Sequence, residues 1–328
     1  MKLGLRLPQR EGVDLQHDVV AAARTAEAAG YESLWAWERL LYPVNPLDPF
    51  PHGQPWPPSH RQVAEPLTVL AAAAVVTSTA RLGTSTTPAA LHGPVQLAKT
   101  LATLDQLSGG RTIAGLSTGW ATDEFHAVGV TRADRGRLID ETLDVFDAVW
   151  GPDPVNYHSS GVVIDNAYVL PKPVSKIPVM LGGGSSMFGL GGGVPSLGRA
   201  GHPRAVARIA RRADGWLPLF STPGKAGADA LRSEWAQIRE LAATYGRDAA
   251  KMEMVVVGNV TFTDKPADSD RTGFVGTLDQ IMEDIASVKE TGADELIIDL
   301  NLQDWWTSTE QMLETAIEIR ERATAARI

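Results

Sequence analysis

The chain alternates short apolar runs with longer segments in which apolar residues recur every three or four positions. Each short run is almost continuously hydrophobic, which is typical of parallel strands covered on both faces. The longer segments predict amphipathic helices, such as Leu15–Ala29 before Gly30. The eight runs begin at Leu3, Ser33, Arg81, Thr112, Pro178, Gly215, Glu253 and Glu295. Repeated strand–helix units of this kind predict an α/β fold, a (β/α)8 TIM barrel.

A doubly wound open sheet is the alternative architecture. It requires a Gly-rich dinucleotide turn after the first strand, and the stretch LRLPQREG lacks that turn. A chain of 328 residues often holds two domains, but single barrels reach this length with insertions. We therefore expect one barrel domain over 1–328, with loop insertions at about 41–65, 152–174 and 182–201. Loops that follow barrel strands crowd the carboxyl face, where active sites form.

Composition narrows the functional classes. The formal net charge is -9, from 39 acidic and 30 basic residues, which argues against nucleic acid or an anionic membrane as a partner. The absence of cysteine excludes disulfides, thiolate zinc sites and a cysteine nucleophile. No secretory signal and no apolar stretch of membrane-spanning length are visible, so we expect a cytoplasmic protein.

Two common catalytic arrangements find little support. No H-E-x-x-H motif, Walker A loop or tight histidine cluster occurs, so we expect no metal. The stretch Gly115–Gly119 matches the G-x-S-x-G nucleophile elbow between a strand and a helix. No HGGG-type oxyanion loop accompanies it, and chance matches to so short a pattern are common. The sequence therefore disfavours Ser117 as a nucleophile.

Tryptophan and small hydroxylated residues gather at the predicted strand ends. Trp37, Glu38 and Arg39 follow the second strand, and Ser85 and Thr86 end the third. Such residues suit close backbone contact with a cofactor and packing against a planar ring. The alternative interpretation is a pair of core tryptophans, a surface ion pair between Glu38 and Arg39, and ordinary β-propensity of threonine.

Several blocks resemble the bacterial luciferase-like flavin and deazaflavin oxidoreductases, and more narrowly those that use the deazaflavin coenzyme F420. The most specific block is ARLGTSTTPAALHGPVQLAKTLATLDQLSGGRTIAGLSTGWATDEFHAVGV, which covers 80–130. The blocks AAGYESLWAWERLLYPVNP, RGRLIDETLDVFDAVW, VLPKPV and ARRADGWLP are also similar to the family. Together these blocks are scattered over most of 1–218, while the C-terminal third matches only in pattern.

The resemblance implies a barrel with the cofactor ring at the carboxyl face. It implies a non-proline cis peptide against the ring, at Ser85-Thr86 or Thr86-Thr87. It further implies that Ser117, Thr118 and Gly119 line the cofactor tail. The stretch Gly182, Gly183, Gly184 and Ser185 resembles the glycine turn that donates backbone N–H groups to the cofactor phosphate, as an anion-binding nest would.

Two positions depart from the deazaflavin sugar-phosphate dehydrogenases of this superfamily. Those enzymes carry an acid–histidine pair after the second strand, where this chain has Glu38 and Arg39. They also carry a glutamate where this chain has Trp120. We therefore expect their proton-handling pair to be missing and the substrate to be small and rather apolar or aromatic.

The preferred hypothesis is hydride transfer between F420 and such a substrate. Glu38 is the expected proton handler, with Tyr42 and His92 as alternatives, and Arg39 is expected to bind an anion or stabilise a reduced ring. Trp37 and Trp120 are expected to wall the substrate. Asn301, just past the last strand, is expected to bond the substrate or to cap a turn.

Two other functions remain open at this stage. One is an FMN-dependent monooxygenase that activates oxygen and needs a separate reductase. The other is a non-catalytic barrel that binds a cofactor. A homodimer formed through the alanine-rich helix at Leu67–Val76 is the expected assembly.

Overall fold

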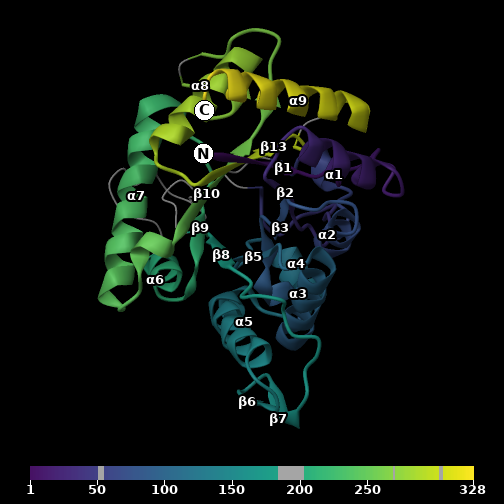
Figure 1. The fold of residues 1–328 in the computed structure, drawn as a ribbon, viewed down its shortest axis with the longest axis vertical. Helices are drawn as coiled ribbons and strands as arrows, with labels where there is room; N and C mark the ends of the chain where they lie inside the picture. Colours follow the sequence, from purple (N-terminus) through teal and green to yellow (C-terminus); the bar gives the residue numbers. More distant parts are fainter. Residues whose placement is uncertain (51–54, 184–202, 269, 303–305) are drawn as a thin grey trace.

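The computed structural model describes residues 1–50, 55–183, 203–268, 270–302 and 306–328. Within them, eight parallel strands close into a barrel, because β3 pairs with β5 as well as with β2. Figure 1 shows helices lying outside these strands. Around the barrel the strands are β1 (Lys2–Arg6), β2 (Ser33–Ala36), β3 (Arg81–Thr84), β5 (Thr112–Ser117), β8 (Val179–Gly182), β9 (Gly215–Leu217), β10 (Glu253–Asn259) and β13 (Glu295–Asp299). The predicted (β/α)8 fold and all eight strand positions are confirmed.

The remaining elements connect these strands. The helices are α1 (Asp18–Ala28), α2 (Pro66–Ala74), α3 (Pro94–Ser108), α4 (Thr122–Ala127), α5 (Arg135–Trp150), α6 (Pro203–Arg212), α7 (Gly224–Thr244), α8 (Leu278–Glu290) and α9 (Thr309–Ala325). Short strands are β4 (Thr87–Pro88), β6 (Val155–His158), β7 (Val163–Ala167), β11 (Thr261–Phe262) and β12 (Val275–Gly276). Among the described residues, no helix has the length and apolar character that crossing a membrane requires.

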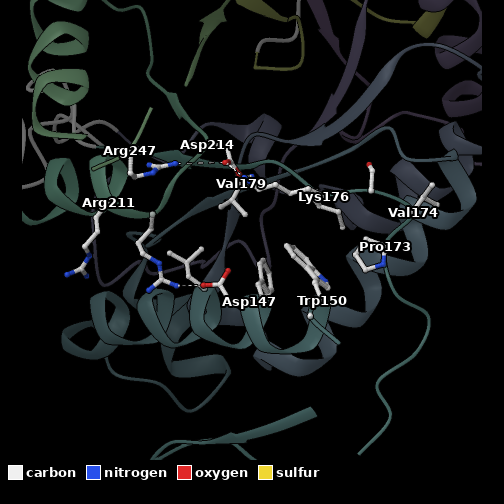
Figure 2. A pocket seen from close by; sticks show the side chains of 15 residues that line it. Asp147, Trp150, Pro173, Val174, Lys176, Val179, Arg211, Asp214 and Arg247 are labelled. Atoms are coloured by element: carbon white, nitrogen blue, oxygen red, sulfur yellow. Dashed lines mark hydrogen bonds and ion pairs between the residues drawn. The ribbon is translucent and has the colours of Figure 1, made fainter. Parts of the chain in front are cut away.

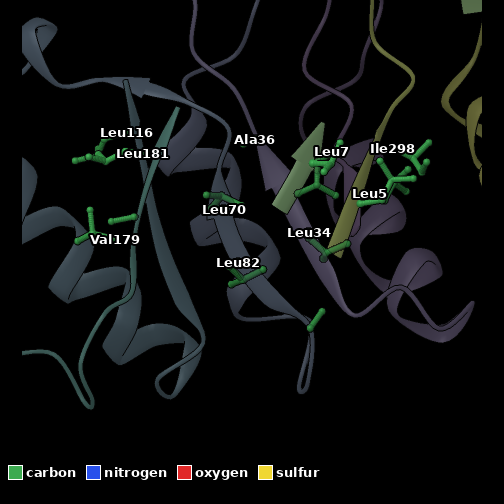
Figure 3. Close-up of a cluster of buried hydrophobic side chains, with 14 of the residues drawn as sticks. Leu5, Leu7, Leu34, Ala36, Leu70, Leu82, Leu116, Val179, Leu181 and Ile298 are labelled. Atoms are coloured by element: carbon green, nitrogen blue, oxygen red, sulfur yellow. The ribbon is translucent and has the colours of Figure 1, made fainter. Parts of the chain in front are cut away.

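Two apolar layers hold the barrel together. The larger one lies between the strands and the surrounding helices, where Leu5, Leu34 and Leu82 pack with Leu70 of α2 (Figure 3). The smaller one fills the barrel around Trp35, which is fully buried. A Cβ atom on Gly83 would lie 2.3 Å from the Trp35 ring, so only glycine leaves room for this indole. These layers fix the strand ends that carry the polar residues.

One of the expected insertions is a β-hairpin at the amino-terminal side of the barrel. Strands β6 and β7 pair antiparallel and follow helix α5, before β8 begins. In Figure 1 they extend away from the barrel. The expectation that the insertions lie at the carboxyl face is therefore wrong for 152–174, because a segment that follows a helix starts from the opposite end. The insertion at 41–65 does follow a strand, β2.

Candidate active site at the carboxyl end of the barrel

A rigid polar shelf joins the ends of β1, β3 and β13. The buried Arg6 guanidinium pairs with Asp299 through Nη1 at 2.5 Å. Its Nη2 donates to both the carbonyl oxygen and the hydroxyl of Ser85, at 2.5 and 2.7 Å. The Ser85-Thr86 peptide is cis, at one of the two positions that the resemblance implied. Arg6 thus holds Ser85 through both its carbonyl and its hydroxyl oxygen.

The side chain of Gln9, in the loop after β1, fixes the backbone of the segment after β2. Its amide donates to the Trp37 carbonyl at 3.0 Å and accepts from the Trp37 N–H at 2.9 Å. The Gln9 N–H donates in turn to Asn301 Oδ1 at 3.2 Å. Asn301 is fully buried and also donates to the Leu7 carbonyl. Its side chain therefore bonds to the protein backbone and links the loop after β1 to the end of β13. This network determines where the next residue, Glu38, is placed.

Glu38 and His92 form an ion pair at the mouth of the barrel. The His92 Nε2 lies 2.8 and 3.0 Å from the two carboxylate oxygens of Glu38, and only 7% of Glu38 is exposed. His92 is half-buried and follows β4 in the chain. Burial lowers the pKa of His92, but the hydrogen bond and the charge of Glu38, together with the charge of Glu65, outweigh it and raise the pKa above its usual value. His92 therefore stays protonated to a higher pH than an ordinary histidine does.

This geometry corrects the expectation that an acid–histidine pair is missing. The acid comes from the segment after β2, and the histidine comes from the segment after β4, 54 positions later. The alternative of a surface ion pair between Glu38 and Arg39 is also wrong, because both side chains are buried and pair with other residues. The two residues that the sequence treated as alternatives, Glu38 and His92, lie together.

Arg39 is enclosed between two tryptophans. Its Nη1 lies 3.1 Å from Glu124 Oε2, and both side chains are less than one tenth exposed. The guanidinium carbon sits 4.8 Å from the Trp56 ring centroid and 4.9 Å from that of Trp120. Burial lowers the pKa of Arg39 and raises the pKa of Glu124, which is the signature of an ion pair withdrawn from water. The Arg39 charge is thus paired with Glu124, and its guanidinium packs against the rings of Trp56 and Trp120.

Aromatic side chains from the loop at 41–65 and from the β5–α4 connection form a roof beside the pair. Trp56 and Trp120 have ring centroids 4.9 Å apart, and Phe50 contacts Trp120 edge-on at 5.7 Å. The loop is fastened to α4, since Asp48 accepts from the Thr122 N–H at 2.7 Å. The Tyr42 hydroxyl donates to the Trp56 carbonyl at 3.1 Å. Trp120, expected in the substrate wall, is thus part of this roof.

His60 lies beneath the roof and is expected to stay neutral. Its ring packs edge-on against Trp37 at 4.7 Å, and burial, with the charges of Arg39 and Arg6, lowers its pKa from 6.5 to about 3. A neutral His60 therefore stabilises the fold fully above pH 6.5, and this contribution is lost as the pH falls toward about 3. In an NMR titration the His60 ring signals are expected to stay constant from pH 8 to about 4.5. A midpoint near 6.5 would contradict this placement.

The expected cofactor-binding residues converge on one corner of the mouth. A Cβ atom on Gly182 would lie 2.9 Å from the Thr86 methyl and 3.7 Å from the Ser117 side chain. Gly119 and Gly183 have φ values of 70° and 93°, which favour glycine. The structure thus brings Thr86, Ser117 and Gly182 together. Thr118 lies in the same connection as Ser117 and Gly119, while Gly184 and Ser185 lie outside the described residues.

Several buried polar atoms around the carboxyl end of the barrel lack a hydrogen-bond partner. Within the described part of the chain they include Trp37 Nε1, His60 Nδ1, Thr87 Oγ1 and Asn259 Oδ1. Each lies at or just beyond the carboxyl end of a barrel strand or on the loop at 41–65. Unpaired buried polar atoms are uncommon and call for a water or a ligand. A polar, planar cofactor fits this donor and acceptor set.

Sequence reasoning missed Gln9, Glu124 and the part that Phe50 and Trp56 take in the roof. Gln9 lies in a loop without periodicity, and its bonds to Trp37 and Asn301 join segments far apart in the chain. Glu124 stands in the first turn of α4, where an acidic residue is ordinary. Only the abundance of proline between 41 and 65, with the aromatic residues among it, indicated that this loop covers something.

The sequence of the chain is similar to those of known proteins. A Mycobacterium tuberculosis protein of uncharacterized function is 34% identical over 201 residues, which cover 60% of this chain and 66% of that protein, just under two thirds. The F420-dependent glucose-6-phosphate dehydrogenase of Kineococcus radiotolerans is 28% identical over 297 residues, which cover 87% of this chain and 77% of that enzyme.

A solved structure and a family model agree with this placement. The monooxygenase RslO1 of Streptomyces bottropensis shares the fold with a TM-score of 0.72 over 100% of both chains, at 17% identity. The model for luciferase-like monooxygenases matches residues 1–272. With most of its length matched and the barrel confirmed, the chain belongs to the luciferase-like monooxygenase family, which includes oxidoreductases that depend on F420.

Proposed function

We propose that this protein is an F420-dependent oxidoreductase that transfers a hydride between the cofactor and a small, apolar or aromatic organic substrate. The observation that carries the proposal is the Glu38–His92 pair at the barrel mouth, beside the Ser85-Thr86 shelf. The similarity to an F420-dependent dehydrogenase over 87% of the chain supports it. Such chemistry needs a positioned cofactor and a proton donor or acceptor, but no covalent protein intermediate.

The residues that would hold the cofactor are those at the mouth corner. Ser85 and Thr86 would bear its ring, Ser117–Gly119 would follow its side chain, and Gly182 and Gly183 would approach its phosphate. Glycine at 182 leaves this corner open, because a larger side chain there would meet Thr86. A bound deazaflavin would supply or accept the hydride.

The pair would move the accompanying proton. A carboxylate only accepts hydrogen bonds, so the proton on His92 Nε2 points to Glu38. Within the described residues His92 Nδ1 makes no hydrogen bond, which leaves it free to exchange a proton with substrate. The raised pKa of His92 favours the protonated ring, which would donate to a carbonyl oxygen as it becomes an alcohol. In the reverse direction the neutral ring would accept the hydroxyl proton.

The roof would select the substrate. Trp37, Phe50, Trp56 and Trp120 offer aromatic surface near the pair. The two arginines packed against these rings, Arg6 and Arg39, are paired with Asp299 and Glu124. An apolar or aromatic carbonyl compound, or the corresponding alcohol, matches the surface.

Titration of the purified protein with F420 and with FMN tests the proposal. We expect saturable quenching of F420 fluorescence, with affinity at least about tenfold tighter than for FMN. Gly182→Val is expected to weaken F420 binding by about tenfold or more, because its side chain would meet Thr86. Ala243→Val, on the exposed face of α7, is the control: it adds an apolar side chain away from the mouth at an ordinary helical position and should not change the affinity.

Two results would replace the proposal. Tight FMN binding without F420 binding would favour the FMN-dependent monooxygenase suggested by the family name, with its separate reductase. F420 binding without turnover of any enone, imine, ketone or alcohol would favour a non-catalytic cofactor-binding barrel. The homodimer through α2 remains a prediction.

A further inference from the structure

A cavity of about 670 Å³ lies at the end of the barrel opposite the mouth (Figure 2). It is bounded by the last turns of α5 and α6 and by the segments that lead into β8 and β9. Its volume falls within the range of small-molecule sites. Nothing in the proposed hydride transfer uses it, since the residues of the mouth lie at the other ends of the strands.

One end of this cavity is basic. Arg212 is fully engaged, with Asp144 at 2.6 Å and Asp147 at 3.0 Å. Arg247 donates through Nη1 to the Ala210 carbonyl at 3.1 Å, while its Nη2 lies 3.9 Å from Asp214, too far for a hydrogen bond. Arg211 has no hydrogen bond or ion pair within the described residues. Two guanidinium groups therefore retain free donors at this end.

The charge of the residues that line the cavity differs in sign from the net charge of the whole chain. The cavity is lined by four cationic residues and two carboxylates, whereas the protein carries a net charge of -9. A local positive field on an acidic protein attracts small anions and is not needed for solubility. Planar guanidinium groups match the two oxygens of a carboxylate.

The other end of the cavity is apolar. Phe146 and Trp150 pack with ring centroids 4.3 Å apart, and the Trp150 N–H is already bound to the Ala98 carbonyl at 3.0 Å. Pro173 and Val174 line the wall beyond them, and Val174 is 53% exposed. Figure 2 shows Arg211 and Arg247 toward one end, and Trp150, Pro173 and Val174 toward the other. The apolar surface and the free cations thus lie toward opposite ends of the cavity.

We propose that this cavity binds an amphipathic organic anion, namely a single carboxylate on an aliphatic or aryl body. The carboxylate meets the free donors of Arg211 and Arg247, and the apolar body covers Trp150 and Val174. Both halves contribute, because apolar burial and charge-assisted hydrogen bonds each add affinity. The proposal is independent of the hydride-transfer function.

Calorimetric titration of the full chain with octanoate at low salt tests this site. We expect one octanoate per chain, with octan-1-ol and inorganic phosphate each binding at least about tenfold more weakly because each lacks one half of the match. Arg211→Gln and Val174→Asp are each expected to weaken octanoate binding by about tenfold or more. Arg204→Gln removes the same charge from the same helix outside the cavity, and it should leave the affinity unchanged.

The proposal fails if octanoate gives no binding, or if Arg211→Gln and Val174→Asp, folded as judged by circular dichroism, bind it as the wild type does. Phosphate binding as tight as octanoate would reduce the site to a simple anion patch. Loss of octanoate binding in Glu38→Gln would place the ligand at the mouth instead. Failure of F420 binding, by contrast, would leave this site unaffected.

Discussion

Replacing Glu38 with glutamine is expected to lower kcat of the F420-dependent reaction by about 10²- to 10⁴-fold, the range that general acid–base catalysis contributes. The amide keeps the size of the side chain but removes the charge that holds the proton on His92. The pH profile is a second readout. Burial lowers the pKa of His92 and Glu38 raises it, so the limb that reports His92 should shift to lower pH in Glu38→Gln.

The partner variant separates a catalytic pair from a structural one. His92→Asn is expected to lose as much activity as Glu38→Gln, and the double variant no more than either, because the two act as a unit. Asp165→Asn breaks the exposed His158–Asp165 pair on the β6–β7 hairpin, and its kcat should equal that of wild type. Unchanged kcat and pH profile in both mouth variants would remove the pair from the mechanism.

Replacing Asp299 with asparagine is expected to lower the free energy of unfolding by about 3–5 kcal/mol, the usual result of breaking a buried ion pair. The change leaves the Arg6 guanidinium, only 5% exposed, without its carboxylate. Arg6 also bonds both oxygens of Ser85, so the shelf is expected to loosen as well. Urea unfolding followed by circular dichroism measures the change.

Two comparisons test the cause of this loss. Asp229→Asn removes the partner of Lys225 and Arg232 on the surface, and its unfolding midpoint should match wild type because exposed pairs contribute little. Arg6→Met combined with Asp299→Leu should recover at least about half of the loss, since apolar residues can replace a buried pair. A wild-type midpoint in Asp299→Asn would show that Arg6 does not depend on this carboxylate.

The fold follows from the sequence because its signals are local. Near-continuous apolar runs, such as the one beginning at Glu295, predict buried parallel strands one at a time. Periodic segments closed by glycine predict helices, and α3 does end at a glycine, Gly109, which has the left-handed conformation. The repeat of these units then leaves few architectures to choose from.

The site is less predictable because its contacts are long-range. Trp37, Glu38 and Thr86 were expected at the mouth, since each follows a barrel strand. The partnership of Glu38 with His92, however, depends on how two loops cross, and neither residue has a local signal for it. Arg39 illustrates the same limit, because Glu124, 85 positions away, decides whether its charge is free or balanced.

The cavity beside α5 and α6 was not predicted at all. Its basic and apolar residues come from the ends of α5 and α6, the segments before β8 and β9, and the residues after α7. In the sequence, Arg211 is an ordinary basic residue in the last turn of a helix. Only the packing of the two helices brings it into the same cavity as Phe146 and Trp150.

A crystal structure of the protein with F420 bound tests the central claim most directly. We expect the deazaflavin ring to rest against Ser85 and Thr86, with Glu38 and His92 lining the side of the ring that is open to substrate. A ring bound elsewhere, or with the Glu38–His92 pair beyond reach of its reactive face, would contradict the account.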